Sequence, residues 1–105
     1  MLSIIIVEND FEKVSPRCLD SVRLAIGAYP HEVIIVDNGL THSVLEESDQ
    51  QVIKIQFPAA GGKAAAKNAG FFASGGDYIL FMDHNIEAEA NSFLELVRFL
   101  ESVPQ

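Results

Sequence analysis

The sequence has a single cysteine, no tryptophan and no long apolar run. One cysteine, Cys18, excludes an internal disulfide and is typical of a protein from a reducing compartment. The amino terminus lacks the basic residues and the long apolar stretch of a secretion signal, so we expect a cytoplasmic protein. The apolar run at residues 4–7 is far shorter than the roughly 20 residues of a membrane-spanning helix, and we expect no membrane span.

Basic residues are scarce as well. Seven Lys and Arg stand against fifteen Asp and Glu, which gives a net charge of -8. This charge disfavours nucleic acids and anionic membranes as partners, because both are polyanions. Apolar residues make up 49% of the chain, enough for a packed core. The length of 105 residues predicts one domain over residues 1–105.

Apolar runs alternate with helical patterns along the whole chain. The composition of strands is found at residues 3–7, 32–37, 51–57 and 77–83. In the third run, polar Lys54 and Gln56 alternate with apolar residues, which is typical of an edge strand, whereas the others resemble strands buried on both faces. The order predicts an α/β fold, an open parallel sheet of about four strands with helices on both faces.

Helices are expected between the strands and after the last one. The first covers residues 16–26, with Ser15 as its N-cap and Pro16 as its first residue. One or two helical turns are expected at 42–48 and a helix at 63–73, and Asn91 caps the last helix. Cys18 falls on the apolar face of the first helix, so we expect it in the core rather than in a reactive site. We also expect Phe71 and Phe72 to pack in the core rather than to stack on a base.

Polar or glycine residues follow every predicted strand. Ligands of an open parallel sheet bind outside the carboxyl ends of its strands. Glu8, Asp37 and Asp83 stand at three of these ends, and Gly61-Gly62-Lys63 follows the remaining strand. A sheet without a ligand shows the same pattern whenever its connecting loops are polar.

The most specific of these positions is Asp83-His84-Asn85. Asp83 and Asn85 provide two oxygen donors, and hard divalent cations bind several oxygens, some of them from phosphate. The alternative is a turn in which the same side chains bond to local backbone N–H groups. His84 is either a further ligand for a metal such as manganese or a solvated loop residue.

Two other features have both a functional and a structural interpretation. Asp37, followed by Asn38-Gly39, either accepts hydrogen bonds from a ribose or base or forms an Asx turn. Lys63 and Lys67 lie on one face of a helix that follows glycines, so they form either a phosphate site or a pair of solvated lysines. The chain has neither a Walker A loop nor a G-x-G-x-x-G motif after its first strand.

In combination these motifs resemble glycosyltransferase family 2 domains of the GT-A type. That family has S-I-I-I, then C-L-D-S, then V-D-N-G-S-T-D, then N-x-G-x-x-x-A-R-N-x-G, and then a strand ending in D-D-D or D-D-N. The corresponding segments here are 3–7 (SIIIV), 18–21 (CLDS), 36–41 (VDNGLT), 62–70 (GKAAAKNAG) and 78–85 (YILFMDHN). Their order and spacing agree, which implies the Rossmann-like amino-terminal half of a GT-A domain.

The resemblance also implies roles for individual residues in binding a nucleoside diphosphate sugar. The turn near Glu8, together with Asp37, would contact the nucleoside. Lys67, in place of the family's arginine, would lie near the diphosphate. Asp83 and Asn85 would hold the ribose and a Mn²⁺ or Mg²⁺ ion that bridges the diphosphate and neutralises charge on the departing group.

The chain departs from the family's motifs at several positions. Residues 7–10 are VEND where the family usually has P-T-Y-N. Ala60 replaces the asparagine of N-x-G, and His42 replaces the aspartate that follows Ser-Thr. The middle residue of the metal motif is His84 rather than an aspartate. We expect this loss of a carboxylate to weaken Mg²⁺ binding and to shift preference toward Mn²⁺ or toward no metal.

Complete family-2 domains are considerably longer, and their second half supplies the acceptor site and, in inverting enzymes, the catalytic carboxylate. We therefore identify no catalytic residue, expect donor binding without activity in this chain alone, and expect self-association through exposed apolar surface. The alternative is a non-catalytic α/β binding or assembly module, which the substitutions at Ala60, His42 and His84 favour. A receiver domain with Glu8 and Asp10 would need a fifth strand carrying a lysine, and the sequence has none.

Overall fold

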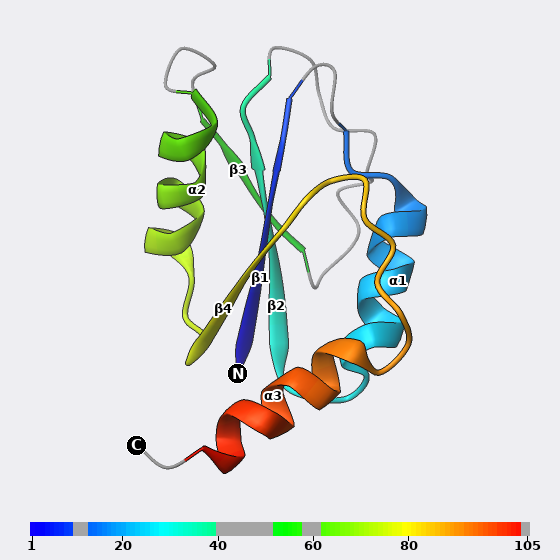
Figure 1. The fold of residues 1–105 in the computed structure, drawn as a ribbon. Helices are drawn as coiled ribbons and strands as arrows, with labels where there is room; N and C mark the ends of the chain where they lie inside the picture. The colour runs from blue at the N-terminus through cyan, green and yellow to red at the C-terminus, as the bar shows by residue number, and fades with distance from the viewer. Residues whose placement is uncertain (10–12, 40–51, 58–61, 104–105) are drawn as a thin grey trace.

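The computed structural model describes residues 1–9, 13–39, 52–57 and 62–103 (Figure 1). Within them the chain forms β1 (Leu2–Glu8), α1 (Pro16–Ile26), β2 (His31–Asp37), β3 (Val52–Gln56), α2 (Gly62–Ala73), β4 (Tyr78–Met82) and α3 (Ser92–Ser102). Each predicted strand is present, with ends that differ by one residue at most. The helical turns expected at 42–48 lie outside the described residues.

All pairs in the four-stranded sheet are parallel, and the strand order is β3-β2-β1-β4. Strands β1 and β2 therefore lie at the centre, and the partly polar β3 lies at one edge of the described sheet. This confirms both the α/β fold and the edge position predicted from Lys54 and Gln56. Strand β4 lies at the other edge, and its Phe81 is 46% exposed, so the expectation that this apolar run is buried on both faces was wrong. The chain leaves β1 toward β2 on one side and returns to β4 on the other, so the direction of strand succession reverses at β1.

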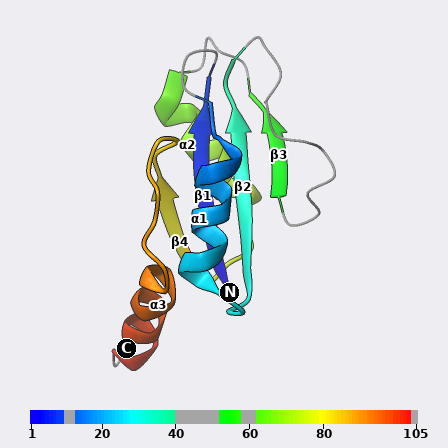
Figure 2. The ribbon, with the colours of Figure 1, turned by 90° about the vertical axis from the view of Figure 1, so that its right-hand side faces the viewer.

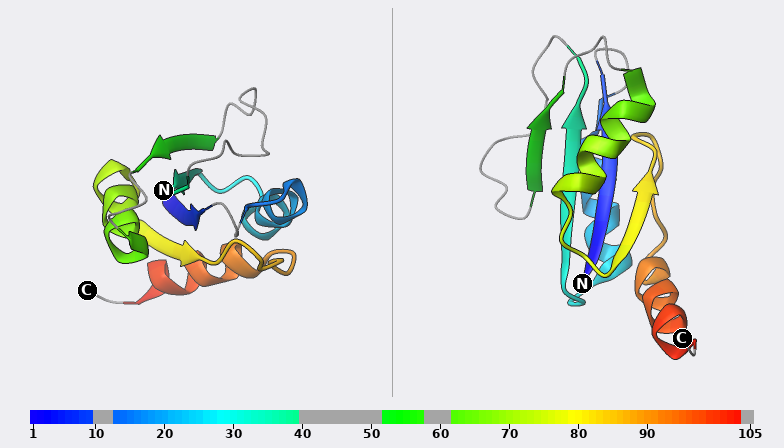
Figure 3. Two further views of the ribbon diagram at one scale, coloured as in Figure 1. Left: turned by 90° about the horizontal axis from the view of Figure 1, so that it is seen from above. Right: turned by 90° about the vertical axis from the view of Figure 1, so that its left-hand side faces the viewer.

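Helices cover both faces of the sheet, as Figures 2 and 3 show. Alternate side chains of each strand point to opposite faces. On β1, Ile4 and Ile6 pack in the cluster beneath α1 and α3, whereas Ile5 and Val7 pack in the cluster beneath α2. Burial of each such side chain stabilises the fold by roughly 1.5–3 kcal/mol.

Helix α1 begins and ends as its sequence predicts. Ser15 Oγ accepts a hydrogen bond from the Cys18 backbone N–H at 3.1 Å, Pro16 follows at the first helical position, and Gly27 ends the helix with φ 60°. Cys18 is buried, which confirms its expected place in the core. Burial raises the pKa of the Cys18 thiol, and the negative charge of Glu87 raises it further.

Helix α2 approaches the sheet through its smallest residues. Ala66 and Gly70 are buried, and a Cβ atom at Gly70 would lie 2.6 Å from Ile5 Cγ2. Phe71 and Phe72 are 49% and 83% exposed, so the prediction that they pack in the core was wrong. Each residue turns a helix by about 100°, so the two residues after Gly70 point away from the sheet. Their rings contact each other edge to face at 5.8 Å.

The start of α3 also differs from the expectation. Asn91 makes no side-chain capping bond and has φ 64°, in the left-handed region. Its backbone N–H donates to the Leu24 carbonyl of α1 at 3.0 Å, and its own carbonyl accepts from the Glu95 N–H. Asn91 therefore joins α3 to α1 through its backbone, and Val97 is buried between the helices and the sheet.

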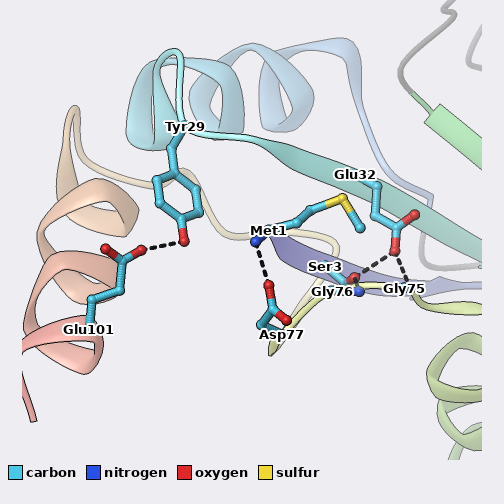
Figure 4. Close-up of polar contacts among 8 residues, drawn as sticks. All are labelled: Met1, Ser3, Tyr29, Glu32, Gly75, Gly76, Asp77 and Glu101. Atoms are coloured by element: carbon cyan, nitrogen blue, oxygen red, sulfur yellow. Dashed lines mark hydrogen bonds and ion pairs between the residues drawn. The ribbon is translucent and has the colours of Figure 1, made fainter.

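A polar cluster ties the α2–β4 turn to the amino ends of β1 and β2 (Figure 4). Ser3 Oγ donates to Glu32 Oε2 at 2.5 Å, and the same oxygen accepts from the Gly75 N–H at 2.7 Å. The Gly76 N–H donates to Ser3 Oγ at 2.8 Å. Asp77 pairs with the Met1 ammonium at 2.9 Å. The cluster fixes the end of the sheet opposite to the predicted site.

None of the described helices is long and apolar enough to cross a membrane.

Candidate functional site

Three polar side chains form a row across the carboxyl ends of β1, β2 and β3. Glu8 is in register with Asp37, and Asp37 is in register with Gln56. Laterally paired residues of a parallel sheet point to the same face, and alternation along the strands places this row on the α1 face. We call Glu8, Asp37 and Gln56 the carboxyl-end row.

Glu8 is completely buried at the end of β1. Its Oε2 accepts a hydrogen bond from the Val14 backbone N–H at 2.9 Å, which fixes the segment leading into α1. Its Oε1 is buried and has no hydrogen-bond partner among the residues that the structure describes, and the same is true of Asn38 Oδ1. Asn38 is adjacent, because its backbone N–H donates to the Glu8 carbonyl at 2.7 Å. An unpartnered buried acceptor costs about 1–3 kcal/mol, which a ligand N–H or O–H group would recover.

Asp37 is 2% exposed, and each of its carboxylate oxygens has a protein donor. Oδ1 accepts from the Gly39 N–H at 3.0 Å, and Oδ2 accepts from Gln56 Nε2 at 3.1 Å. The Asx turn considered from the sequence is therefore present. It does not preclude a ligand, because a carboxylate offers about four acceptor positions.

Gln56 was not singled out by sequence reasoning as a site residue. In the sequence it is recognisable only as a polar residue at the end of an edge strand. Its contact with Asp37 follows from the register of β2 and β3, which the structure shows.

Asp83 and Asn85 follow β4 on the other side of β1. Strand β4 pairs with β1 as far as Met82 and Ile6, so the chain leaves β4 beside the last residues of β1. Asp83 and Asn85 are exposed, and the Asp83 carbonyl accepts from the Ile86 N–H at 3.3 Å, which closes a turn. Within the described ranges, no group of three or more His, Cys, Asp or Glu side chains is placed to hold a metal ion.

The segment between this turn and α3 runs along α1 (Figure 2). Arg17 Nε pairs with Glu87 Oε1 at 2.7 Å, and the Ala88 N–H donates to Ser21 Oγ at 3.0 Å. These contacts, with the bond from Asn91 to α1, set the position of the turn that carries Asp83. Nothing in the sequence pattern predicted them.

The predicted lysine lies in a different layer. Lys67 is exposed on α2, which covers the opposite face of the sheet from the carboxyl-end row. Helix α2 runs back from the carboxyl ends of the strands, and Lys67 lies in its second turn (Figure 3). The structure thus brings Glu8 and Asp37 together, places Asp83 and Asn85 after the neighbouring strand, and leaves Lys67 on the other side.

Two of the family departures, Ala60 and His42, lie outside the described residues. His84 is partly buried in the turn between Asp83 and Asn85.

Comparison with known proteins gives a consistent picture. A family model described as Glycosyl transferase family 2 matches residues 3–104. The uncharacterized glycosyltransferase alr2836 of Nostoc sp. (strain PCC 7120) is 34% identical over 88 residues, which cover 78% of this chain and 27% of that protein. This chain therefore spans about a quarter of that relative.

Two crystal structures of S. aureus TarS have a similar fold. One has a TM-score of 0.73 and 18% identity, covering 95% of this chain and 19% of that chain. The other, of TarS 1-349, has a TM-score of 0.73 and 19% identity, covering 95% of this chain and 32% of that chain. At these identities the likeness concerns the fold alone.

Proposed function

This chain belongs to glycosyl transferase family 2, and we propose that it is the part of such an enzyme that binds the nucleoside diphosphate sugar. The observation that carries this proposal is the pair of buried carboxylates at the carboxyl ends of the central strands, where Glu8 Oε1 has no donor within the described part of the chain. Ligands of open parallel sheets bind at that edge.

The nucleoside would bind against Glu8 and Asp37. A ribose and a base offer O–H and N–H donors, and both residues offer acceptors. Glu8 Oε1 and the remaining acceptor positions of Asp37 would take these donors. Because both side chains are buried, each such bond would form away from water, where hydrogen bonds are stronger.

The diphosphate would lie toward Asp83 and Asn85. One carboxylate and one amide oxygen are too few for a complete cation site, but a cation held by them would gain further oxygens from the diphosphate. When bound, the ion would neutralise negative charge on the departing nucleoside diphosphate. Because His84 replaces a carboxylate, we propose Mn²⁺ rather than Mg²⁺. We propose Lys67 as an additional positive charge that acts on the diphosphate across the carboxyl edge of the sheet, since α2 begins at that edge although Lys67 lies on the opposite face from the carboxyl-end row.

Sugar transfer would need residues beyond these 105. The relative from Nostoc has almost three quarters of its length outside the matched region. We therefore propose donor binding without transfer by this chain alone, in a cytoplasmic setting. The alternative is a non-catalytic binding module, and the same experiment distinguishes the two.

The test is calorimetric titration of the chain with UDP, GDP, CDP and dTDP, each with Mn²⁺, with Mg²⁺ and without metal. We expect one nucleotide to bind, with higher affinity when Mn²⁺ is present. Asp37→Ala and Asp83→Ala should each weaken binding about tenfold or more, since each removes a charged hydrogen-bond or metal partner. Asp20→Ala, on the exposed side of α1, is the matched control and should bind normally.

Two results would count against this account. Absence of binding by all four nucleotides would favour the non-catalytic module. Binding that is tightest with Mg²⁺ would leave the donor site in place but contradict the metal preference derived from His84.

A further inference from the structure

Gln56 is the member of the carboxyl-end row that has no role in the proposed function. We propose that Gln56 is a positioning residue, which orients the Asp37 carboxylate so that it can accept hydrogen bonds from the nucleoside. This inference rests on the proposed function, and it adds a contribution from the third strand, β3, to a site otherwise formed by β1, β2 and β4.

The geometry around Asp37 supports this role. Gln56 Nε2 donates to Oδ2 at 3.1 Å, and the Gly39 N–H donates to Oδ1 at 3.0 Å. With one donor on each oxygen, rotation of the carboxylate about its last side-chain bond is fixed from both sides. The end of β3 is itself attached to β2, because the Phe57 N–H donates to the Asp37 carbonyl at 2.9 Å.

The chemistry of an amide suits this position. A lysine or arginine at residue 56 would also donate to Asp37, but its positive charge would compete with the donors of a ligand. The neutral amide donates one N–H and leaves the negative charge of the carboxylate available. Since Gln56 is exposed and Asp37 is 2% exposed, the amide reaches from the surface of the edge strand to a buried acid.

Each carboxylate oxygen keeps one further acceptor position in this arrangement. These positions have a fixed direction before a ligand binds, so that less ordering is required on binding. Gln56 would therefore affect the affinity for the nucleoside and leave the affinity for the diphosphate unchanged.

The experiment measures dissociation constants for Gln56→Met, which keeps the length of the side chain and removes the donor. The ligands are UDP, GDP, CDP and dTDP, the four corresponding nucleosides, and inorganic pyrophosphate with Mn²⁺. We expect the nucleoside and nucleoside diphosphate that bind the unaltered chain to lose about tenfold in affinity, and pyrophosphate to lose none. Ile53→Thr, at an exposed position of the same strand on the opposite face, is the control and should bind like the unaltered chain.

A double-mutant cycle identifies the residue through which Gln56 acts. If Gln56 only positions Asp37, then Gln56→Met should cause no additional loss of affinity in the Asp37→Ala background. Melting curves of all variants confirm that they are folded at the temperature of the titration, and Gln56→Ala takes the place of Gln56→Met if the latter does not fold.

The outcomes separate this inference from the proposed function. Unchanged nucleotide affinity in a folded Gln56 variant would overturn the positioning role and leave the donor site intact. Equal losses for nucleotide and pyrophosphate, or a loss that persists without Asp37, would show a general structural effect and also overturn it. If no nucleotide binds the unaltered chain, both the proposed function and this inference fail.

Discussion

Glu8, Asp37, Asn38 and Ser3 are the charged or polar side chains that the described core buries. Three of them lie at the carboxyl ends of the central strands, and Ser3 lies in the polar cluster at the other end. Sequence reasoning correctly predicted that Glu8 and Asp37 stand at the ends of strands, because a continuous apolar run that stops at a carboxylate marks the end of a buried strand. It did not find Gln56, because a hydrogen bond between β2 and β3 depends on their register rather than on either sequence.

At the residue scale, the buried thiol of Cys18 should resist modification. Burial raises its pKa, so less of it is in the reactive thiolate form, and the core blocks access. We expect slow reaction with a thiol-reactive disulfide reagent in the native protein and complete reaction in denaturant. A Cys18→Ser, Ala64→Cys variant, whose thiol lies on the exposed side of α2, should react at once; equal rates for the two proteins would contradict the core position.

Tyr29 should titrate at unusually high pH. Its hydroxyl donates to Glu101 Oε1 at 2.5 Å, and this bond raises the pKa of Tyr29 to about 12. A raised pKa in the folded state means that the contribution to stability is complete below the unfolded value of about 10 and is lost as the pH rises toward 12.

The measurement is the ultraviolet absorbance of tyrosinate in a Tyr78→Phe background, where Tyr29 is the remaining tyrosine. Glu101→Gln should move the Tyr29 titration to lower pH, because the carboxylate that favours the neutral phenol is removed. An identical titration curve in both proteins would show that Glu101 has no effect on Tyr29.

At the scale of elements, α2 depends on the absence of a side chain at Gly70. The sequence predicted the helix from its alanines, but it could not show which face meets the sheet, since alanine is compatible with either. That ambiguity is why Phe71 and Phe72 were assigned to the core. Asn91 was assigned as a cap on residue type alone, whereas its backbone contact with α1 depends on how α1 and α3 pack.

Gly70→Ala should therefore destabilise the protein although alanine is the better helix former. The gain in helix propensity is about 1 kcal/mol, and the cost of forcing a methyl group against Ile5 and Val36 is about 1–3 kcal/mol. We expect a net decrease in the free energy of unfolding, measured by urea denaturation. Asn68→Ala, at an exposed position of the same helix, should raise it slightly. A rise for both variants would show that α2 does not pack closely on the sheet.

At the scale of the whole molecule, several large apolar side chains remain exposed. Phe72 is 83% exposed, Phe99 is 65% exposed, and Phe81 on the edge strand β4 is 46% exposed. Exposed apolar surface favours association, so we expect the protein to self-associate as its concentration increases. Sedimentation velocity should show this, and Phe81→Thr should weaken it. A monomer over the whole concentration range would contradict the expectation.

The fold as a whole followed from sequence patterns more readily than the site did. Alternation of strand and helix, and the contrast between the continuous run in β1 and the alternating pattern of β3, predicted the sheet and its edge. The position of the turn carrying Asp83 depends instead on tertiary contacts of Arg17 and Ser21 with the following segment. Such contacts between distant segments have no local sequence signature.

The central claim is that a nucleoside diphosphate binds at the carboxyl ends of the strands. The most direct test is a ¹⁵N NMR titration of the labelled chain with the nucleotide that calorimetry identifies, in the presence of Mg²⁺, which replaces Mn²⁺ because the unpaired electrons of Mn²⁺ would broaden the signals near the site. We predict that the amide signals of Glu8, Asp37 and Asp83 shift, whereas those of Ser3 and Gly76 at the opposite end of the sheet do not. Shifts confined to the Ser3 and Gly76 end, or no shifts at saturating nucleotide, would contradict the claim.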